Sequence, residues 1–419
     1  MSYTIVYDAT ELVTGPARRS GAEQTPTSAD DPIVATESDA AIVASDGDVV
    51  ATGASDAVRR EYPVENAATA VDASGKCVLP GFVDCHTHAL FAGDRSDEFE
   101  AKLRGKEYQE ILAEGGGILR TVRAVRAADE GALVEGLLDR LDTMLAHGTT
   151  TVEVKSGYGL ETETELKMLS AIERAAERHP VDVVPTFMGA HAVPEGADAD
   201  AYAETVVDDQ LPAVAEQGVA EFCDVFCEEG VFSVDQSRRI LAAGADAGLT
   251  PKIHADEFAN LGGARLAAAL SAASADHLLR STDDDVGALV DAGVTPVLLP
   301  GTAFGLDGEY PDLAPYRERG VVPAIGSDFN PNCYARTMGF AATLACVGVG
   351  MTPAEAILGI TERGAAALDR ADGRGTLEPG AAADLVVLDA PSYRHLPYVY
   401  DGTLVETVLK AGEAVVGEQ

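Results

Sequence analysis

Basic residues are scarce in this chain. Of its 419 residues, 30 are Lys or Arg and 69 are Asp or Glu, which gives a formal net charge of −39. A nucleic-acid binder needs the opposite balance, because its basic side chains must neutralise phosphates. The composition therefore argues against a nucleic-acid partner. The acids are spread along the whole chain, which indicates a solvated acidic surface whose self-repulsion salt would screen, and we infer a halophilic source.

Other absences argue against a membrane protein and against a secreted protein. The chain has no run of about 18 apolar residues, so no membrane span and no membrane partner are expected. Its first residues lack the basic and apolar regions of a secretory signal. The six cysteines show no Cys-x-x-Cys spacing and are expected to be reduced thiols. Together these observations predict a cytoplasmic protein.

The most informative stretch covers residues 78–88 and reads Val-Leu-Pro-Gly-Phe-Val-Asp-Cys-His-Thr-His. Its apolar first part has β character, and it ends in two histidines, His86 and His88. Residues two apart on a strand project to the same face, about 6.6–7 Å apart. Both imidazoles can therefore reach one metal ion, although the bare His-x-His pattern is weak evidence when it stands alone.

The middle of the chain alternates between candidate strands and alanine-rich helical segments, the longest of which is expected from Ile118 to about His147. Eight such repeats over about 250 residues predict an α/β fold of the (β/α)8 TIM-like barrel type. A doubly wound open sheet is the alternative, but no Gly-x-Gly-x-x-Gly pattern follows the first strand. The candidate strands end near His86, Val154, His191, Cys227, His254, His277, Leu298 and Asp328.

Both ends of the chain are rich in short β-like runs. Asp46-Gly47 lies between two such runs and is a strong hairpin signal. Residues 383–389 and 405–412 look like strands near the other end, so we expect the two ends to pair into one small β-sandwich. Residues 14–39 lack periodicity and are rich in turn-forming residues, which predicts a surface loop. The expected domains are residues 1–77 and 375–419 for the β-sandwich and residues 78–374 for the barrel.

Histidines gather at one end of the predicted barrel. The chain has eight histidines, and five of them fall at the predicted carboxyl ends of strands. Barrel enzymes place their chemistry at this end, whereas histidines scattered through a core would not sort in this way. The five are His86, His88, His191, His254 and His277.

With His-x-His on the first strand, His254 on the fifth, His277 on the sixth and Asp328 on the eighth, the chain resembles the metal-dependent amidohydrolase superfamily. Longer blocks resemble, within it, the imidazolonepropionases of histidine degradation. The resemblance covers essentially the whole chain, and the blocks together are far more specific than any single motif. They are residues 153–160 (Glu-Val-Lys-Ser-Gly-Tyr-Gly-Leu), 254–257 (His-Ala-Asp-Glu), 274–278 (Ser-Ala-Asp-His-Leu) and 327–331 (Ser-Asp-Phe-Asn-Pro).

The resemblance implies a site for one zinc or iron ion per chain and a homodimer. Three neutral nitrogens and a carboxylate suit either metal and leave room for a water. The implied ligands are His86, His88, His254 and Asp328, and the implied substrate contacts are Arg95, Tyr158, His191, Glu257, Asn330, Asn332 and Cys333. The pair Asn332-Cys333 departs from the Gly-Ser or Gly-Thr associated with many family members.

The implied reaction is hydrolysis of the ring amide C–N bond of 4-imidazolone-5-propanoate to N-formimidoyl-L-glutamate. A bound dication would lower the pKa of its water from about 15.7 towards about 7.

Three residues are expected to take part in this chemistry. Glu257 would move a proton from the water to the leaving nitrogen, which needs a carboxylate of raised pKa. His277 would hydrogen-bond the water or the carbonyl oxygen as it gains charge, and Asp328 could accept a proton as well as bind the metal.

Arg95 could hold the substrate's propanoate with two parallel N–H bonds, helped by Tyr158. Related two-metal enzymes bridge their ions with a carbamylated lysine on the fourth strand. Lys155 lies on the second strand instead, so we expect a single ion.

Two other readings stay open. Another amidohydrolase, such as a nucleobase or triazine deaminase, would share the metal ligands, but an enzyme of neutral bases has no use for Arg95 and Tyr158. A barrel kept only as an assembly module would be expected to lose ligands, and all four are present here.

Overall fold

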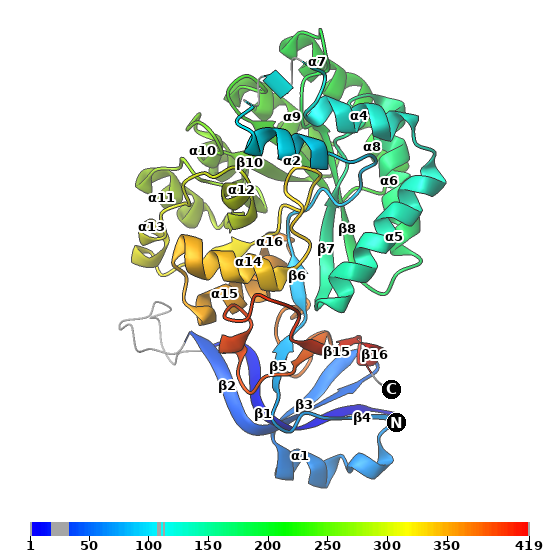
Figure 1. Ribbon diagram of the computed structural model, residues 1–419, viewed down its shortest axis with the longest axis vertical. Helices are drawn as coiled ribbons and strands as arrows, with labels where there is room; N and C mark the ends of the chain where they lie inside the picture. Colours follow the sequence, from blue (N-terminus) through cyan, green and yellow to red (C-terminus); the bar gives the residue numbers. More distant parts are fainter. Residues whose placement is uncertain (1, 18–32, 107–109, 112–113, 418–419) are drawn as a thin grey trace.

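The structure is a computed structural model, and it describes residues 2–17, 33–106, 110–111 and 114–417. It contains a barrel surrounded by helices and a separate mixed sheet, with both chain termini beside the mixed sheet (Figure 1). This arrangement places the barrel and the paired chain ends in different parts of the molecule.

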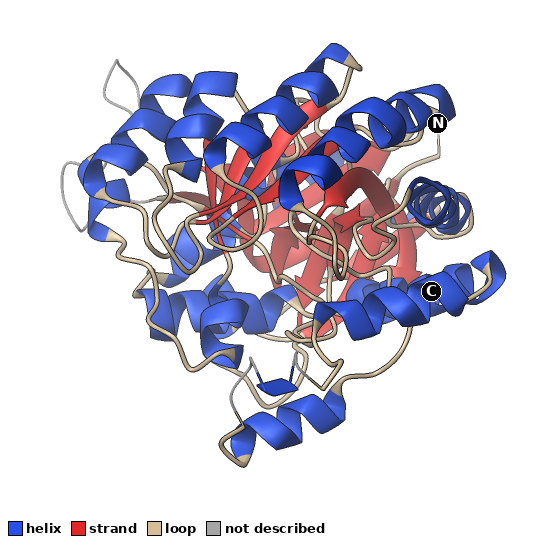
Figure 2. Ribbon diagram, turned by 90° about the horizontal axis from the view of Figure 1, so that it is seen from above, coloured by secondary structure: helices blue, strands red, loops and turns tan. Residues whose placement is uncertain are grey.

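Over the described residues, eight parallel strands form the barrel sheet in the order β13-β12-β11-β10-β9-β8-β7-β6. A parallel bridge between Thr87 and Phe329 joins the ends of the first and last strands. Figure 2 shows the strands at the centre with helices around them, which confirms the predicted (β/α)8 barrel. The strands are β6 (Phe82–Asp84), β7 (Thr149–Lys155), β8 (Asp182–Ala190), β9 (Phe222–Cys227), β10 (Thr250–Ala255), β11 (Ser274–His277), β12 (Thr295–Leu298) and β13 (Ala324–Ile325).

The helices of the barrel follow its strands. The single long helix expected between residues 118 and 147 is two helices, because the chain turns at Asp129 and the Asp129 side chain accepts the Ala132 N–H as the cap of the second. The helices are α2 (Ser96–Leu103), α4 (Ile118–Ala127), α5 (Glu130–Ala146), α6 (Thr162–Ala176), α7 (Ala199–Thr205), α8 (Leu211–Gln217), α9 (Val234–Asp246), α10 (Gly263–Leu270), α11 (Asp283–Ala292), α12 (Pro300–Gly305), α13 (Ala314–Glu318), α14 (Met338–Leu344), α15 (Pro353–Gly359) and α16 (Glu362–Ala367).

The two chain ends pair, as predicted, and over the described residues their strands form one mixed sheet where a small β-sandwich was expected. The strand order is β16-β15-β14-β5-β1-β2-β3, with β4 on β1, and the pairing of β14 with β5 joins the ends. Helix α1 (Ser55–Glu61) follows β3. The domain boundaries stay a prediction. The strands are β1 (Thr4–Pro16), β2 (Val34–Ser45), β3 (Asp48–Ala54), β4 (Thr69–Asp72), β5 (Cys77–Pro80), β14 (Leu385–Leu388), β15 (Val405–Lys410) and β16 (Glu413–Val416).

The prediction of a surface loop over residues 14–39 is wrong at both ends of that range. Strand β1 continues to Pro16 and β2 begins at Val34, because the two strands pair antiparallel as far as the Pro16–Val34 pair. Backbone hydrogen bonds between neighbouring strands extend them beyond the residues with an apolar pattern. The middle of the predicted loop, residues 18–32, lies outside the described residues.

The barrel mouth faces away from the mixed sheet. The chain passes from β5 into β6 and then to α2, which lies at the end of the barrel far from the mixed sheet (Figure 1). His86 and Asp328, expected at strand ends, lie two and three residues beyond them, since β6 ends at Asp84 and β13 at Ile325. Asp328 has φ 50°, in the left-handed region that is uncommon for a residue other than glycine.

No described helix has both the length and the apolar character needed to span a membrane. All six cysteines are free thiols, as the spacing predicted.

Candidate metal centre

Three histidine rings converge at the barrel mouth. His86 and His88 follow β6, His254 lies on β10, and each offers a ring nitrogen within 4.8 Å of the others. Nε2 of His88 and Nε2 of His254 are 3.3 Å apart. Nε2 of His86 is buried and has no hydrogen-bond partner among the described residues. A buried polar atom normally has a partner, so this orphaned nitrogen fits a metal ligand.

Asp328 completes the cluster with an oxygen. Its Oδ1 lies 3.7 Å from Nε2 of His86 and 3.8 Å from Nε2 of His88, and its Oδ2 accepts a hydrogen bond from Thr302. The backbone N–H of Asp328 donates to the carbonyl of His86 at 3.1 Å, which ties the two ligand loops together. Three nitrogens and one carboxylate form a donor set that suits zinc or iron with a position left for water.

The histidines are held in the protonation state that metal binding needs. Burial lowers the pKa of His86 and of His88 well below the ordinary value, so both are neutral. Nδ1 of His86 lies 2.6 Å from Asp276 and Nδ1 of His254 lies 3.1 Å from Asp224. A carboxylate can only accept here, so each Nδ1 carries the proton and each Nε2 keeps its lone pair for the metal.

Two buried lysines form ion pairs with these carboxylates. Nζ of Lys155 lies 2.7 Å from Asp224 and 2.8 Å from Glu153. Burial alone would lower the pKa of Lys155, but Asp224 and Glu153 outweigh it and raise the pKa above its ordinary value, so the ammonium stays charged. Nζ of Lys252 lies 3.4 Å from Glu153 and 3.9 Å from Asp276, and it donates to the carbonyl of Cys85.

This supporting layer was missed in the sequence. Charged residues inside otherwise apolar strands were its only signal: Glu-Val-Lys on β7, Asp on β9, Pro-Lys-Ile-His on β10 and Ser-Ala-Asp-His on β11. An ionisable residue in a strand buried on both faces needs a charged partner, and that requirement could have pointed to the network. The residues concerned are Glu153, Asp224, Lys252 and Asp276.

Glu257 and His277 lie beside the cluster. Oε2 of Glu257 is 3.6 Å from Nε2 of His277. The His277 ring centre is 5.2 Å from that of His254 and 5.5 Å from that of His86. Burial, followed by the charges of Asp328 and Glu228, raises the pKa of Glu257 well above its ordinary value. A carboxyl of raised pKa takes up and releases protons at a higher pH than an ordinary glutamate does.

Tyr158 and His191 also reach the cluster. The His191 ring stacks on His88 with ring centres 4.6 Å apart, and its Nδ1 donates to the carbonyl of Gly157 at 3.0 Å. The Tyr158 ring lies 5.2 Å from His191 and 6.0 Å from His88. Burial lowers the pKa of His191 to about 3, so it is a neutral hydrogen-bonding group.

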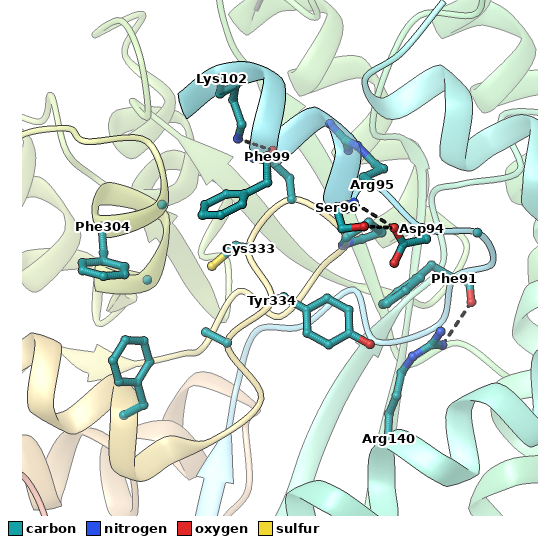
Figure 3. Close-up of a pocket in the computed structure, with 17 residues that line it drawn as sticks. Phe91, Asp94, Arg95, Ser96, Phe99, Lys102, Arg140, Phe304, Cys333 and Tyr334 are labelled. Atoms are coloured by element: carbon teal, nitrogen blue, oxygen red, sulfur yellow. Dashed lines mark hydrogen bonds between the residues drawn. The ribbon is translucent and has the colours of Figure 1, made fainter. Parts of the chain in front are cut away.

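Arg95, Asn332 and Cys333 line a cavity of about 470 Å³ at the same end of the barrel (Figure 3). The cavity contains none of the metal-binding residues. It adjoins them, because it is bordered by Phe91, three residues after His88, and by Gly301, beside the Thr302 that contacts Asp328.

Asn330 is not in the cavity lining. Its Nδ2 donates to the carbonyl of Asp328, and its Oδ1 accepts the backbone N–H groups of Asn332 and Cys333. The Asn330 side chain therefore holds the shape of the loop that carries Asp328.

Comparisons with known proteins agree with this geometry. Residues 77–415 match the Amidohydrolase family. An imidazolonepropionase of Haloarcula marismortui is 63% identical over 411 residues, covering 98% of this chain and 95% of the relative. One of Halobacterium salinarum is 59% identical over 419 residues, covering 99% of this chain and 98% of the relative. The inferred halophilic source fits these two organisms.

The fold is also found among solved structures. The crystal structure of guanine deaminase from Bradyrhizobium japonicum superposes with a TM-score of 0.73 over the whole of both chains, at 16% sequence identity. At this identity the likeness concerns the fold alone. The matched family and the curated relatives decide the relationship, and the chain belongs to the amidohydrolase family and, within it, to the family of imidazolonepropionases.

Proposed function

We propose that this protein is a hydrolase that opens the ring of 4-imidazolone-5-propanoate by cleaving its amide C–N bond, which yields N-formimidoyl-L-glutamate. The observation that carries the proposal is the convergence of His86, His88, His254 and Asp328 in a chain that is 63% identical to a curated imidazolonepropionase.

The four converging donors would hold one zinc or iron ion. When bound, such an ion supplies a water that ionises near neutral pH, which is the nucleophile that amide hydrolysis needs. A single ion is supported by Lys155 and Lys252, whose ammonium groups already pair with Glu153 and with the carboxylates behind the ligands. These ammonium groups take the place in which a second cation would otherwise balance charge.

Protons are moved by the residues beside the cluster. Glu257 accepts a proton from the attacking water at a carboxylate oxygen and delivers it to the ring nitrogen that leaves. Asp328, whose Oδ1 lies beside Nε2 of His86 and of His88, would be a second proton acceptor. His277, 3.6 Å from Glu257, donates a hydrogen bond to the carbonyl oxygen as negative charge develops on it.

The remaining site residues bind the substrate. Arg95 grips the propanoate with the help of Tyr158, and His191 holds the imidazolone ring close to the ligand His88. Asn330 shapes the loop that presents Asn332 and Cys333 to the substrate.

The test is hydrolysis of imidazolonepropanoate, followed by loss of the ring absorbance and by detection of N-formimidoyl-L-glutamate. Guanine, a neutral base, is the comparison substrate and should not react. His86→Ala should lose the metal and the activity together. Turnover of guanine without turnover of imidazolonepropanoate would favour the deaminase alternative instead.

The proposal includes a cytoplasmic location and a homodimer, which the reduced cysteines and the family resemblance support. Light scattering at high salt measures the mass of the assembly.

A further inference from the structure

Lys102, at the barrel mouth, differs from most lysines of this chain in its bonding partner. Nζ of Lys102 donates to Oδ1 of Asn332 at 3.0 Å, and among the described residues no carboxylate lies within ion-pairing distance of it. In a chain with 69 acidic and 30 basic residues, a lysine without an acidic partner is unusual. Of the other six lysines, Lys76, Lys106, Lys155, Lys252 and Lys410 pair with carboxylates and Lys167 donates to three backbone carbonyls.

Arg95 is the positive charge that acts on Lys102. Arg95 precedes α2 and Lys102 lies in its last turn, seven positions on, which places both on one face of the helix. Burial, followed by the positive charge of Arg95, lowers the pKa of Lys102. Nε of Arg95 contacts Glu98 at 2.8 Å, so its two terminal nitrogens remain for other acceptors. Glu98 also acts on Lys102, in the opposite direction to Arg95, so these three groups together carry one net positive charge, which favours an anion beside them.

Both cations line the cavity of about 470 Å³. Figure 3 shows Lys102 and Phe99 extending from α2 toward the loop of Cys333 and Tyr334, with Phe304 across the cavity. The acidic side chain in the lining, Asp94, accepts the N–H and the hydroxyl of Ser96. The cavity therefore combines aromatic walls with positive charge, which suits a small planar molecule that carries an anionic tail.

We propose that Lys102 is a second substrate-binding cation, which together with Arg95 clamps the carboxylate of the substrate's propanoate. Asn332 positions the ammonium group: its amide oxygen takes one of the three N–H donors and leaves two for the carboxylate. This gives a role to Asn332, where many family members have a glycine. The inference rests on the proposed function, because that substrate supplies the carboxylate.

The test replaces Lys102 by methionine, which keeps the length of the side chain and removes its charge. A hydrogen bond between charged groups contributes enough that the KM for imidazolonepropanoate should rise about 10- to 100-fold, with kcat changed less than about twofold. Lys102→Arg should keep most of the affinity. Lys106→Met is the matched control, because Lys106 lies on the same segment but pairs with Glu114 outside the cavity.

A binding measurement without turnover distinguishes a substrate-binding role of Lys102 from a structural one. The probes are 3-(imidazol-4-yl)propanoate and its neutral amide, titrated into the metal-loaded enzyme and followed by calorimetry. Lys102→Met should weaken binding of the acid about 10- to 100-fold and leave that of the amide unchanged. Equal losses for both probes, or no loss for either, would overturn the clamp. Absence of hydrolysis by the wild type would refute the proposed function instead, whatever the binding results.

Discussion

Asp224 and Asp276 set the tautomer of two of the proposed metal ligands. Each accepts a hydrogen bond from Nδ1 of a histidine, His254 or His86, and each is held by a buried lysine. Such partners fix the tautomer and the orientation of the ring. The chemistry of the site therefore depends on residues one layer below the ligands.

Replacing Asp224 or Asp276 by asparagine should weaken metal binding about 10- to 100-fold, because a neutral amide polarises the histidine less and can turn its NH2 group toward the ring. Competition with a chromophoric chelator measures the affinity. Asp384→Asn is the control, since Asp384 is also buried and paired with a lysine, Lys410, but lies in the mixed sheet region. Unchanged metal affinity in both the Asp224 and the Asp276 variant would show that these carboxylates do not support the histidine ligands.

The pH profile reports on Glu257. Burial, then Asp328 and Glu228, raises the pKa of Glu257, and the proton acceptor must be ionised in the free enzyme. As pH falls, a group of raised pKa is protonated sooner, so kcat/KM should decline at a pH well above the ordinary glutamate value of about 4.3. Glu257→Gln should lower kcat strongly at every pH and abolish this limb. An acid limb that persists unchanged in the residual activity of the glutamine variant would assign it to another group.

At the scale of elements, the barrel brings the ligands together through the loops that follow β6 and β13. Gly326 is the first residue after β13 and faces His86 on the other loop. A Cβ at Gly326 would lie 2.9 Å from Cβ of His86 and 2.8 Å from Cδ2 of Leu299. The absence of a side chain at this position lets the two loops approach. Backbone geometry, as much as the ligands themselves, determines the site.

Gly326→Ala should therefore lower the free energy of unfolding by about 1–3 kcal/mol and weaken metal binding, because His86 must move. Chemical denaturation of the metal-free protein and chelator competition measure the two effects. Gly402→Ala is the control, because a Cβ at Gly402 meets no atom within 4 Å. A variant with both properties unchanged would show that the loops tolerate the extra atom.

How far the sequence predicts these elements depends on what each one is made of. The barrel strands were predictable, because buried β runs ending in His254 or His277 carry both a pattern and a chemical marker. The break at Asp129 was missed, since its cap is a single hydrogen bond inside a helical pattern. The ion pair of Lys155 with Asp224 was missed as well, because β8 lies between β7 and β9 and the contact depends on the closed barrel rather than on local sequence.

At the scale of the whole molecule, the excess of acidic residues decides the conditions under which the fold is stable. A formal net charge of −39 repels itself at low ionic strength, and salt shortens the range of that repulsion from about 30 Å at 0.01 M to about 3 Å at 1 M. Ion pairs on the surface offset little of it.

The protein should therefore unfold on transfer to low salt, and its Tm should rise with KCl concentration. Circular dichroism during thermal melting at a series of KCl concentrations measures this, and refolding on return to salt shows that the change is reversible. A Tm indifferent to salt would contradict the electrostatic explanation.

The central claim is that one ion at His86, His88, His254 and Asp328 carries the hydrolysis. The most direct measurement is a titration of the metal-free protein with zinc or ferrous iron, in which bound metal and imidazolonepropanoate hydrolysis are followed together. The metal-free protein should show no activity, and activity should rise linearly with bound metal until one ion per chain is bound. Activity in the metal-free protein, or a rise that continues to two ions per chain, would contradict it.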